Sequence, residues 1–270
     1  RGGERSRPPR EILGEIRRLA EHGIREVTLL GQIVDRYGLD LSPPTDLARL
    51  LEQTCEIQAL LRVRFLTSHP NWLTDRLLDA VVALPKVCPY FEVPFQSGND
   101  EVLARMKRGY EADDYRRVVG RIRARIPHAA IHTDIIVGFP GETEAQFMDS
   151  HRLLEELRLD VAHIAQYSER PGTAAARNIE DDVPAAEKQR RWQVLEALQT
   201  GIQAGKNSAL LGRTVEVLVE ERAKNGRWSG RTPQNKLVFF DDPRDLRGQL
   251  VPVSLDWTGP FTLIGKAAAP

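Results

Sequence analysis

The side chains best suited to bind a small molecule in this 270-residue chain come directly after short apolar runs. Hydrogen-bonding groups or glycines stand at each of these places: Gln32, Ser68 and His69, Gln96 and Ser97, residues 138–142, and Tyr167 and Ser168. Ligands bind at the carboxyl ends of parallel strands, both in α/β barrels and in open α/β sheets. If the apolar runs are parallel strands, we expect these groups to form one binding site.

The alternation of apolar runs with amphipathic segments predicts a parallel sheet, because parallel neighbours need a crossover of about a dozen residues or more. The expected strands are residues 24–30, 62–66, 90–95, 131–137 and 161–166. The expected helices are residues 10–22, 45–56, 73–83, 100–106, 112–125 and 144–157. Thr143 followed by Gln146 predicts a capping box at the start of the last helix. This periodicity is equally typical of an α/β barrel and of an open sheet.

The pattern changes after Pro184. Residues 184–206 predict one long amphipathic helix, with Trp192, Leu195, Leu198 and Ile202 on its apolar side. Short strands then follow at residues 214–221, 227–230, 236–240, 248–253 and 261–264. Their length and spacing predict a small antiparallel β-barrel. We therefore expect two domains, residues 1–206 and 207–270.

Composition excludes several classes of protein. The formal net charge is zero, so no global field draws the chain to nucleic acid or to a membrane. No apolar run approaches the roughly 20 residues that cross a bilayer. Cys55 and Cys88 are the only cysteines, which fits neither a disulfide framework nor a metal site and suits a reducing cytoplasm. The opening Arg1-Gly2-Gly3 resembles the middle of a chain, and we expect a fragment.

Five segments, in order, resemble the MiaB-like methylthiotransferases of the radical S-adenosylmethionine enzymes. They are RGGERSRP at 1–8, TLLGQ at 28–32, PFQSG at 94–98 with MKRGY at 106–110, TDIIVGFPGET at 133–143, and YSERPGT at 167–173. The C-terminal strands, with Gly230-Arg231-Thr232 and Asn235-Lys236, resemble the TRAM RNA-binding domain of that family. The resemblance covers essentially the whole chain. It implies a partial TIM-like (β/α) radical SAM barrel followed by a TRAM-like β-barrel.

The resemblance also implies cofactors and their location. Members of the family use a [4Fe-4S] cluster to cleave S-adenosylmethionine, and the radical formed removes a hydrogen atom that a methylthio group replaces. By similarity, Gly31 and Gln32 lie near the methionine. The other cofactor-binding positions implied are Ser68, Gln96 and Ser97 in the cleft, and Asp134, Gly138 and Pro140 near the adenosine. Arg108 and Arg170 are further candidates for a phosphate or for the methionine carboxylate.

The cluster ligands are missing from this chain. In the family, a CxxxCxxC loop lies just before the Arg-Gly-x-Glu segment, and an N-terminal domain holds a second cluster. Iron–sulfur clusters need thiolate ligands, so we assign no catalytic residue and no metal ligand here. We expect two [4Fe-4S] clusters in the full-length parent and no activity in the fragment itself.

The resemblance implies that the parent converts N6-isopentenyladenosine beside the tRNA anticodon to its 2-methylthio derivative, in the cytoplasm. The implied partners are tRNA and an electron donor, with no membrane. The candidate RNA-binding residues are Arg213, Lys224, Arg227, Arg231 and Lys236. Trp228 and Phe239 are either base-stacking residues or part of the core. Two alternatives stay open: methylthiolation of an aspartate in a ribosomal protein, and a non-catalytic RNA-binding protein.

Overall fold

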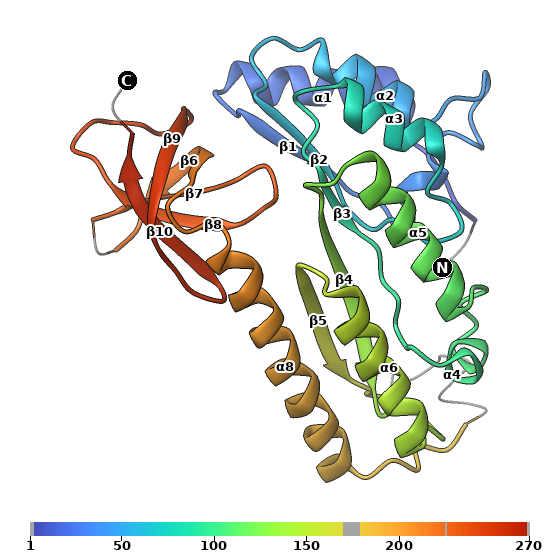
Figure 1. Ribbon diagram of the computed structural model, residues 1–270. Coiled ribbons are helices and arrows are strands. Elements are labelled where there is room, and N and C mark those ends of the chain that lie inside the picture. Colours follow the sequence, from blue (N-terminus) through green and yellow to red (C-terminus); the bar gives the residue numbers. More distant parts are fainter. Residues whose placement is uncertain (1–2, 170–178, 225, 269–270) are drawn as a thin grey trace.

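A curved layer of parallel strands and a separate small barrel, joined by one long helix, make up the molecule (Figure 1). The computed structural model describes residues 3–169, 179–224 and 226–268. The elements of the first part are α1 (Pro9–Glu21), β1 (Glu26–Leu29), the 3-10 helix η1 (Val34–Arg36), α2 (Leu47–Cys55), β2 (Arg62–Phe65), α3 (Asp75–Ala83), β3 (Tyr90–Glu92), α4 (Asp100–Arg105), α5 (Ala112–Arg125), β4 (Ala130–Val137), α6 (Glu144–Leu157) and β5 (Val161–Gln166). These strands and helices confirm the α/β alternation read from the sequence.

All five strands of the first part run parallel. β1 pairs with β2, and β3, β4 and β5 form a second sheet in that order. A parallel bridge between Val63 and Val87 joins the two sheets, so they form one curved layer. The strands are short, and they twist relative to one another as parallel strands do. The layer is therefore an open, partial barrel.

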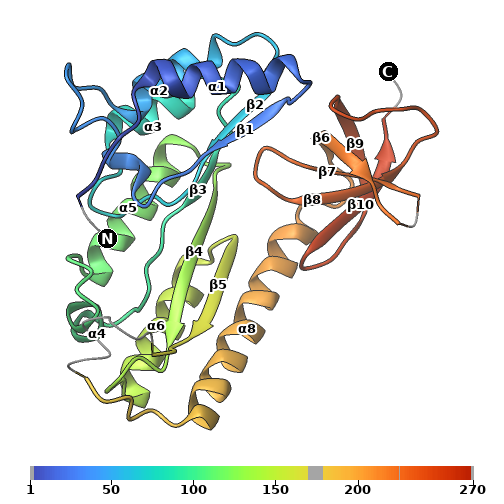
Figure 2. The same ribbon diagram turned by 180° about the vertical axis from the view of Figure 1, so that it is seen from behind.

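The two faces of the layer differ in chemistry because side chains alternate along each strand. Val63 and Phe65 of β2 and Ile131 and Ile135 of β4 point to the face covered by the helices and lie in the main hydrophobic core. The residues between them carry polar groups and point to the other, concave face. Seen from behind, this face of β4 and β5 is not covered by α5 or α6 (Figure 2).

Side-chain caps set where several helices begin. Asp46 accepts the N–H of Arg49 at the start of α2, and Thr74 accepts the N–H of Leu77 at the start of α3. Thr143 and Gln146 form the predicted capping box of α6, which is thereby confirmed. Capping satisfies N–H groups that the first turn of a helix leaves unpaired.

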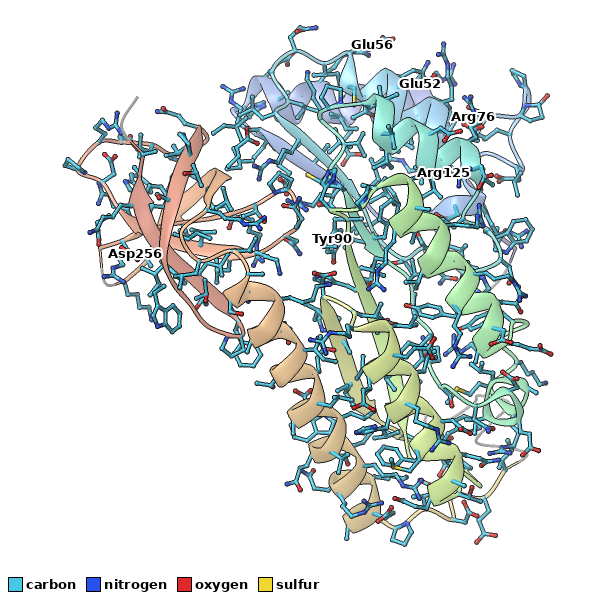
Figure 3. All side chains as sticks on the ribbon, in the orientation of Figure 1. Glu52, Glu56, Arg76, Tyr90, Arg125 and Asp256 are labelled. Carbon is cyan, nitrogen blue, oxygen red and sulfur yellow. The ribbon has the colours of Figure 1, made fainter. Side chains whose placement is uncertain are left out.

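The outer surfaces of the covering helices carry ordinary exposed ion pairs (Figure 3). Arg76 of α3 lies 2.7 Å from Asp46 and 3.5 Å from Glu52, and Arg125 of α5 lies 2.8 Å from Asp75. Exposed pairs of this kind contribute between roughly 0 and 1 kcal/mol each. They make this surface soluble in water and give no sign of a binding site.

The helix α8 (Ala185–Ser208) runs beside β5 and leads into the small barrel (Figures 1 and 2). Leu195 and Ile202 are buried against the main core, and Trp192 and Leu198 pack partly buried beside them, as the sequence predicted. The indole N–H of Trp192 donates to the carbonyl of Ile164 in β5 at 3.0 Å. Within the described ranges, no helix is long and apolar enough to cross a membrane.

The small barrel is closed and has five strands. They are β6 (Thr214–Arg222), β7 (Trp228–Arg231), β8 (Leu237–Asp241), β9 (Leu250–Thr258) and β10 (Thr262–Ala267). Their order around the barrel is β10-β8-β7-β6-β9. Every pairing is antiparallel, as predicted, except that of β8 with β10, which is parallel. Its own core includes Val217, Trp228 and Phe240.

Two buried arginines join the small barrel to the amino ends of the parallel strands. Arg62 is 3% exposed and donates to the carbonyls of Arg231 (2.5 Å) and Glu216 (3.2 Å). Arg64 is 4% exposed and donates to the carbonyls of Thr232 (2.8 Å) and Pro233 (2.7 Å). These contacts place the turn between β7 and β8 against the concave face of the partial barrel.

Candidate functional site

The loops after the five parallel strands are tied to one another by backbone hydrogen bonds, each bridging neighbouring strands. Val34 N donates to the carbonyl of Thr67, joining the loops after β1 and β2 at 3.2 Å. Gln96 N donates to the carbonyl of Asp134, and Tyr167 N to that of Val137. The polar segments predicted from the sequence therefore do meet at one mouth, at the carboxyl ends of the strands.

The first part of this mouth is a cavity beside β1. Gly31 and Gln32 line it together with residues of α1 and of the segment before α1, and its volume is about 1000 Å³. Both residues are exposed. A side chain at position 31 would meet Val34 at 3.1 Å, so glycine allows η1 to fold back closely on the strand end.

Asp35 organises the loops after β1 and β2. Its carboxylate accepts the hydroxyl of Ser68 at 3.0 Å and the backbone N–H of His69 at 2.8 Å. Burial raises the pKa of Asp35 to about 6, although both hydrogen bonds oppose the shift. Ser68 is itself buried, so its hydroxyl serves to hold this loop.

Two residues at the strand ends adopt a left-handed backbone that side chains disfavour. Thr67 after β2 has φ of 70°, and Gln96 after β3 has φ of 65°. A residue of this kind costs of order 1 kcal/mol or more and is found most often at functional sites. Gln96 keeps this conformation because its N–H and C=O both bond to β4, to Asp134 O and Ile136 N, at 2.9 Å each.

Ser97 connects the end of β3 to α6. It is fully buried, its hydroxyl lies 3.4 Å from that of Ser150, and it accepts the N–H of Asn99 at 3.3 Å. Gly98 N also donates to the Ser150 hydroxyl at 2.8 Å. The Ser97 side chain therefore positions the loop after β3, and its predicted role in cofactor binding stays a prediction.

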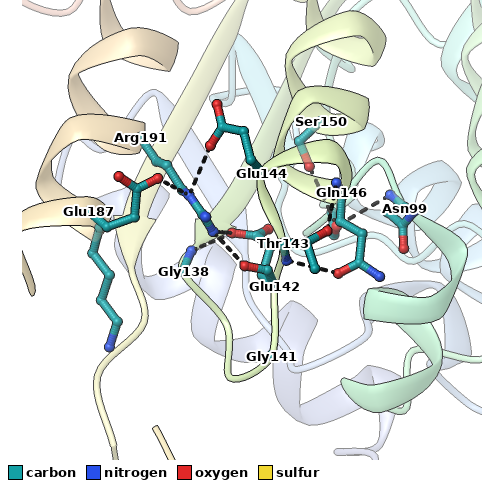
Figure 4. Close-up of polar contacts among 12 residues, drawn as sticks. Asn99, Gly138, Gly141, Glu142, Thr143, Glu144, Gln146, Ser150, Glu187 and Arg191 are labelled. Atoms are coloured by element: carbon teal, nitrogen blue, oxygen red, sulfur yellow. Dashed lines mark hydrogen bonds and ion pairs between the residues drawn. The ribbon is translucent and has the colours of Figure 1, made fainter. Parts of the chain in front are cut away.

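The turn after β4 is built around a buried carboxylate (Figure 4). Glu142 accepts the N–H of Gly138 at 2.7 Å and the guanidinium of Arg191 at 2.9 Å, which also donates to the Glu142 carbonyl. Glu187 accepts from Arg191 at 2.7 Å. Burial raises the pKa of Glu142, and the Gly138 N–H and Arg191 oppose that shift. One carboxylate thus fixes a turn of five residues.

A second residue of α8 closes on the same turn. The aliphatic part of Lys188 packs on Gly138, whose φ is 69°, and a Cβ at that position would overlap it. The Lys188 ammonium donates to Asp181 at 2.7 Å and to the carbonyl of Tyr167 at 3.4 Å. Pro140 lies in the turn and is buried. The predicted residues Gly138 and Pro140 therefore belong to a rigid loop held by α8.

The concave face next to this mouth carries two carboxylates, Asp134 and Glu92, that have few hydrogen bonds or ion pairs. Asp134 of β4 stands opposite His163 of β5 in the strand register, and His163 is exposed. Burial raises the pKa of Asp134, and His163 and Arg108 oppose the shift. Glu92 of β3 also has a raised pKa, first from burial and then from the nearby charge of Asp134. In the described part of the chain, the Asp134 carboxylate has no hydrogen bond or ion pair, so it is available to a ligand.

Toward the amino ends of the strands, the polar side chains on this face contact one another. The Tyr90 hydroxyl lies 3.3 Å from both Glu92 and His132. His132 is buried, and burial lowers its pKa to about 3, so this ring is neutral. Tyr90 lies beside the small barrel, where Arg64 lies over its ring at 5.6 Å (Figure 3).

Neither cysteine is near the candidate site. Cys55 ends α2 and Cys88 precedes β3, so both lie toward the amino ends of strands. Burial raises the pKa of both thiols, that of Cys88 to about 11. No group of three or more His, Cys, Asp or Glu that could hold a metal occurs among residues 3–169, 179–224 and 226–268. The residues present do not fit an iron–sulfur cluster.

The predicted RNA-binding residues separate into two groups. Lys224 and Arg213 are exposed, and Arg227 lies 3.3 Å from Asp241. Arg231 and Lys236 flank the turn that contacts the parallel strands, and Lys236 donates to Asn207 at 2.8 Å. Trp228 is buried and donates to the carbonyl of Arg244 at 3.0 Å, so it belongs to the core. Arg170 and the remainder of the 170–173 segment lie outside the described residues.

Sequence patterns did not predict the contributions of Arg191, Lys188 and Asp35. Arg191 and Lys188 lie in the first two turns of α8, a charged stretch that resembles a solvated helix face. Lys188, Arg191 and Leu195 are spaced three and four residues apart, so they lie on one face of the helix. That face points toward β4 and β5. That periodicity was the available signal.

Comparison with known families and proteins gives consistent matches. The profile of the radical SAM superfamily matches residues 1–154, and that of the TRAM domain matches residues 209–268. Two relatives carry the name tRNA-2-methylthio-N(6)-dimethylallyladenosine synthase. That of Chloroflexus aurantiacus is 51% identical over 268 residues, and that of Roseiflexus sp. is 52% identical over 272 residues. They match 98% and 99% of this chain, which spans 57% of the length of each.

Solved structures share the fold at low sequence identity. Coproporphyrinogen III oxidase (HemN) of Escherichia coli, a radical SAM enzyme, is 17% identical with a TM-score of 0.54, covering 91% of this chain and 57% of its own. Methylornithine synthase (PylB) is 16% identical with a TM-score of 0.51, covering 73% of this chain and 56% of its own. At such identities the likeness concerns the fold alone, and it confirms the α/β architecture.

Proposed function

This chain belongs to the radical SAM superfamily, and on that premise we propose that it is the central and C-terminal part of a tRNA methylthiotransferase. The proposed reaction replaces the C2 hydrogen of N6-isopentenyladenosine, beside the anticodon, with a methylthio group. The observation that carries this proposal is the identity of 51% to 52% with the two synthases across 98% to 99% of the chain. That identity extends over both the partial barrel and the small barrel.

We propose that S-adenosylmethionine binds at the carboxyl ends of the parallel strands. Gly31 and Gln32 would lie by its methionine, and Asp134 would accept hydrogen bonds from its polar groups. The unpaired carboxylate of Asp134 and the exposed amide of Gln32 support this assignment. Ser68, Ser97 and the turn from Gly138 through Pro140 would shape the cleft, because buried contacts already hold them.

The radical chemistry would come from S-adenosylmethionine together with an iron–sulfur cluster. We propose that the full-length protein holds two such clusters and takes electrons from a separate donor protein. Their cysteine ligands would lie beyond these 270 residues, since Cys55 is half-buried and Cys88 is buried, both at the opposite ends of the strands. The residues of this chain would bind, orient and shield the cofactor, and the chain alone would have no activity.

The small barrel would contact tRNA, the proposed substrate of the full-length enzyme. Because tRNA is modified in the cytoplasm, we propose that the enzyme acts there. The match of residues 209–268 to the TRAM domain supports this part of the proposal. The alternative protein substrate, an aspartate of a ribosomal protein, has no comparable support, because the two relatives described here are named for a tRNA nucleoside.

Mass spectrometry of tRNA nucleosides tests the proposal directly. We expect a strain that lacks the full-length gene to lose 2-methylthio-N6-isopentenyladenosine and to recover it when the gene is restored. An Asp134→Asn gene should restore little of it, whereas an Arg76→Gln gene, altered on the outer helices, should restore all of it.

Two other outcomes would decide against the proposal. Unchanged tRNA together with an unmodified ribosomal-protein aspartate in the deletion strain would establish the protein substrate. Unchanged tRNA and unchanged ribosomal proteins, with RNA binding by the full-length protein, would establish a binding protein without this activity.

A further inference from the structure

An apolar row crosses the outside of the small barrel on three adjacent strands. Phe239 of β8 is in register with Ile264 of β10, and Ile264 is in register with Trp257 of β9. Phe239 and Ile264 point outward, because their strand neighbours Val238 and Leu263 fill the barrel core. Trp257 also faces outward, because a register shift opposite Ile264 and Gly265 leaves Asp256 as an extra residue between it and the core residue Leu255. Trp257 is 48% exposed, and Phe261, in the turn that follows β9, is 63% exposed. We call the three aromatic residues Phe239, Trp257 and Phe261, together with the aliphatic Ile264 between them, the aromatic row.

The chain holds the indole of Trp257 in a fixed place. Gly259 lies against the six-membered ring, so closely that a Cβ at position 259 would overlap it. Gly259 is buried, and its N–H donates to the carbonyl of Thr262 at 2.9 Å. The six-membered ring of the indole is therefore packed against the backbone at Gly259, and about half of Trp257 stays open to solvent. A flat ring that is already immobilised loses little entropy when a second flat group stacks on it.

Basic side chains surround the aromatic row. Lys266 of β10 is 82% exposed, two residues from Ile264, and the exposed Arg213 is bonded through its backbone to Leu255 at 2.9 Å. Lys236 does not belong to this basic set, because it is largely buried and paired with Asn207 at 2.8 Å and Asp160 at 3.8 Å. Asn207 in turn donates to the carbonyls of Gly259 and Pro260 in the turn below Trp257. The exposed Asp256 next to Trp257 forms an ion pair with Lys266 at 3.9 Å (Figure 3).

The opposite candidate surface of the small barrel is already covered. The turn that carries Thr232 and Pro233 receives the guanidinium of Arg64, and the Arg231 carbonyl receives that of Arg62. Trp228, the other tryptophan of the barrel, is buried in its core. Of the two tryptophans, only Trp257 can stack on an external group.

We propose that the aromatic row, with Trp257 at its centre, is a stacking surface for unpaired bases of an RNA strand. Every base has a π-face, and aromatic side chains on small β-barrels bind single strands by stacking while cations follow the phosphates. The row offers the rings, and the exposed residues Lys266 and Arg213 offer the cations. This inference rests on the proposed function, since it names the surface with which the same protein would hold its tRNA.

Direct binding of a short RNA tests the surface without any cofactor. The probe is a 12-nucleotide oligoadenylate labelled with fluorescein, titrated with the 270-residue chain at low salt and followed by fluorescence anisotropy. We expect Trp257→Ala to weaken binding about tenfold or more, because stacking contributes about 1–3 kcal/mol per base. Trp257→Phe should recover most of the affinity, and Leu250→Ala, at the far end of β9, should leave it unchanged.

Gly259→Ala sharpens the test because it keeps the tryptophan and only displaces its ring. We expect it to weaken binding about threefold or more. RNA should also quench the fluorescence of the chain, and the quenching should vanish in Trp257→Phe but persist in Trp72→Phe. Circular dichroism would confirm that each variant is folded.

Three results would overturn the inference. The first is equal affinity of the wild-type chain and Trp257→Ala for the oligoadenylate. The second is quenching that persists in Trp257→Phe. The third is RNA-dependent quenching in the 270-residue chain but none in the full-length protein, which would show that another part of the protein covers the row. None of these bears on the tRNA nucleoside measurement, so the proposed function can fail or hold independently.

Discussion

The two ends of the same parallel strands are used in opposite ways. At the amino ends, Arg62 and Arg64 are buried and donate to several carbonyls of the small barrel and to the carboxylates of Glu216 and Glu26. At the carboxyl ends, Asp134 has no such partner in the described structure, and Thr67 and Gln96 hold disfavoured backbone angles. One end is saturated with protein contacts and the other keeps unused polar groups.

The difference shows how to tell structural polar groups from ligand-binding ones in this fold. Burial alone does not distinguish the two ends, because Glu142 at the carboxyl ends is as deeply buried as Arg62 and is also paired, whereas Asp134 is half-buried and unpaired in the described structure. A buried charge that is fully hydrogen-bonded is already accounted for by the fold, whereas one that lacks partners costs stability until a ligand supplies them. By that criterion, the unpaired carboxylate of Asp134 favours the proposed binding site at the carboxyl ends.

The largest effect should come from breaking the saturated end. Arg64→Met should lower the free energy of unfolding by about 3–5 kcal/mol, because Glu26 and the carbonyls of Thr232 and Pro233 lose their partner. Denaturant unfolding measures the change, and Arg49→Met, on the exposed side of α2, is the matched control. A loss below about 1 kcal/mol would mean that the interface contributes little to stability.

A somewhat smaller loss is expected when the turn at the carboxyl ends is forced open. Gly138→Ala places a Cβ against Lys188 and an L-residue at φ of 69°, so we expect a loss of about 2–3 kcal/mol. Gly120→Ala, in the middle of α5 with open space around it, should instead stabilise by about 1 kcal/mol. Thermal unfolding of both variants side by side would show whether the loss is specific to the turn.

A still smaller change in the free energy of unfolding, in this case a gain, is expected when the unpaired carboxylate of Asp134 is removed. Burial raises the pKa of Asp134 in the folded state, so its contribution to stability is fully present below the ordinary value and is lost as pH rises through the raised one. Asp134→Asn should remove this loss and raise the free energy of unfolding at pH 7 by up to about 1 kcal/mol. The test compares urea unfolding of both proteins from pH 3.5 to pH 7, where identical curves would contradict the account.

The smallest effect on stability is expected on the surface of the small barrel. Arg213→Ala should change the free energy of unfolding by less than about 0.5 kcal/mol, since Arg213 is exposed. It should nevertheless lower the salt dependence of RNA binding by about one phosphate contact. Anisotropy titrations at several salt concentrations would measure this, and an unchanged slope would exclude Arg213 from the RNA surface.

Much of the fold followed from local patterns. Helix boundaries such as those of α5 and α6 were predictable because capping residues and apolar spacing act within a few residues. The meeting of Gln32, Ser68 and Gln96 at one mouth also followed, because parallel strands bring their carboxyl ends to the same edge. The parallel pairing of β8 with β10 did not, since closure of a barrel depends on which strands meet in space.

The roles of charged residues were harder to predict. Arg231 and Lys236 have the composition of an RNA-binding edge, yet the turn between them lies against the parallel strands, because Arg62 and Arg64 come from distant sequence. Arg191 resembles a solvated helix residue, yet it is the main partner of Glu142. The sequence shows the charge of each side chain, but only tertiary packing determines which group that side chain contacts.

The helix α8 has a further consequence for how a substrate is chosen. Its first turns grip the turn after β4 through Lys188 and Arg191, and its last turn is bonded through Asn207 to the base of the aromatic row. A helix of 24 residues is stiff and about 36 Å long. If RNA binds at the aromatic row and the cofactor at the strand ends, as we propose, the helix sets a fixed distance between these two sites. A nucleotide can then be selected by its distance along the RNA from the gripped bases, without its neighbours being read.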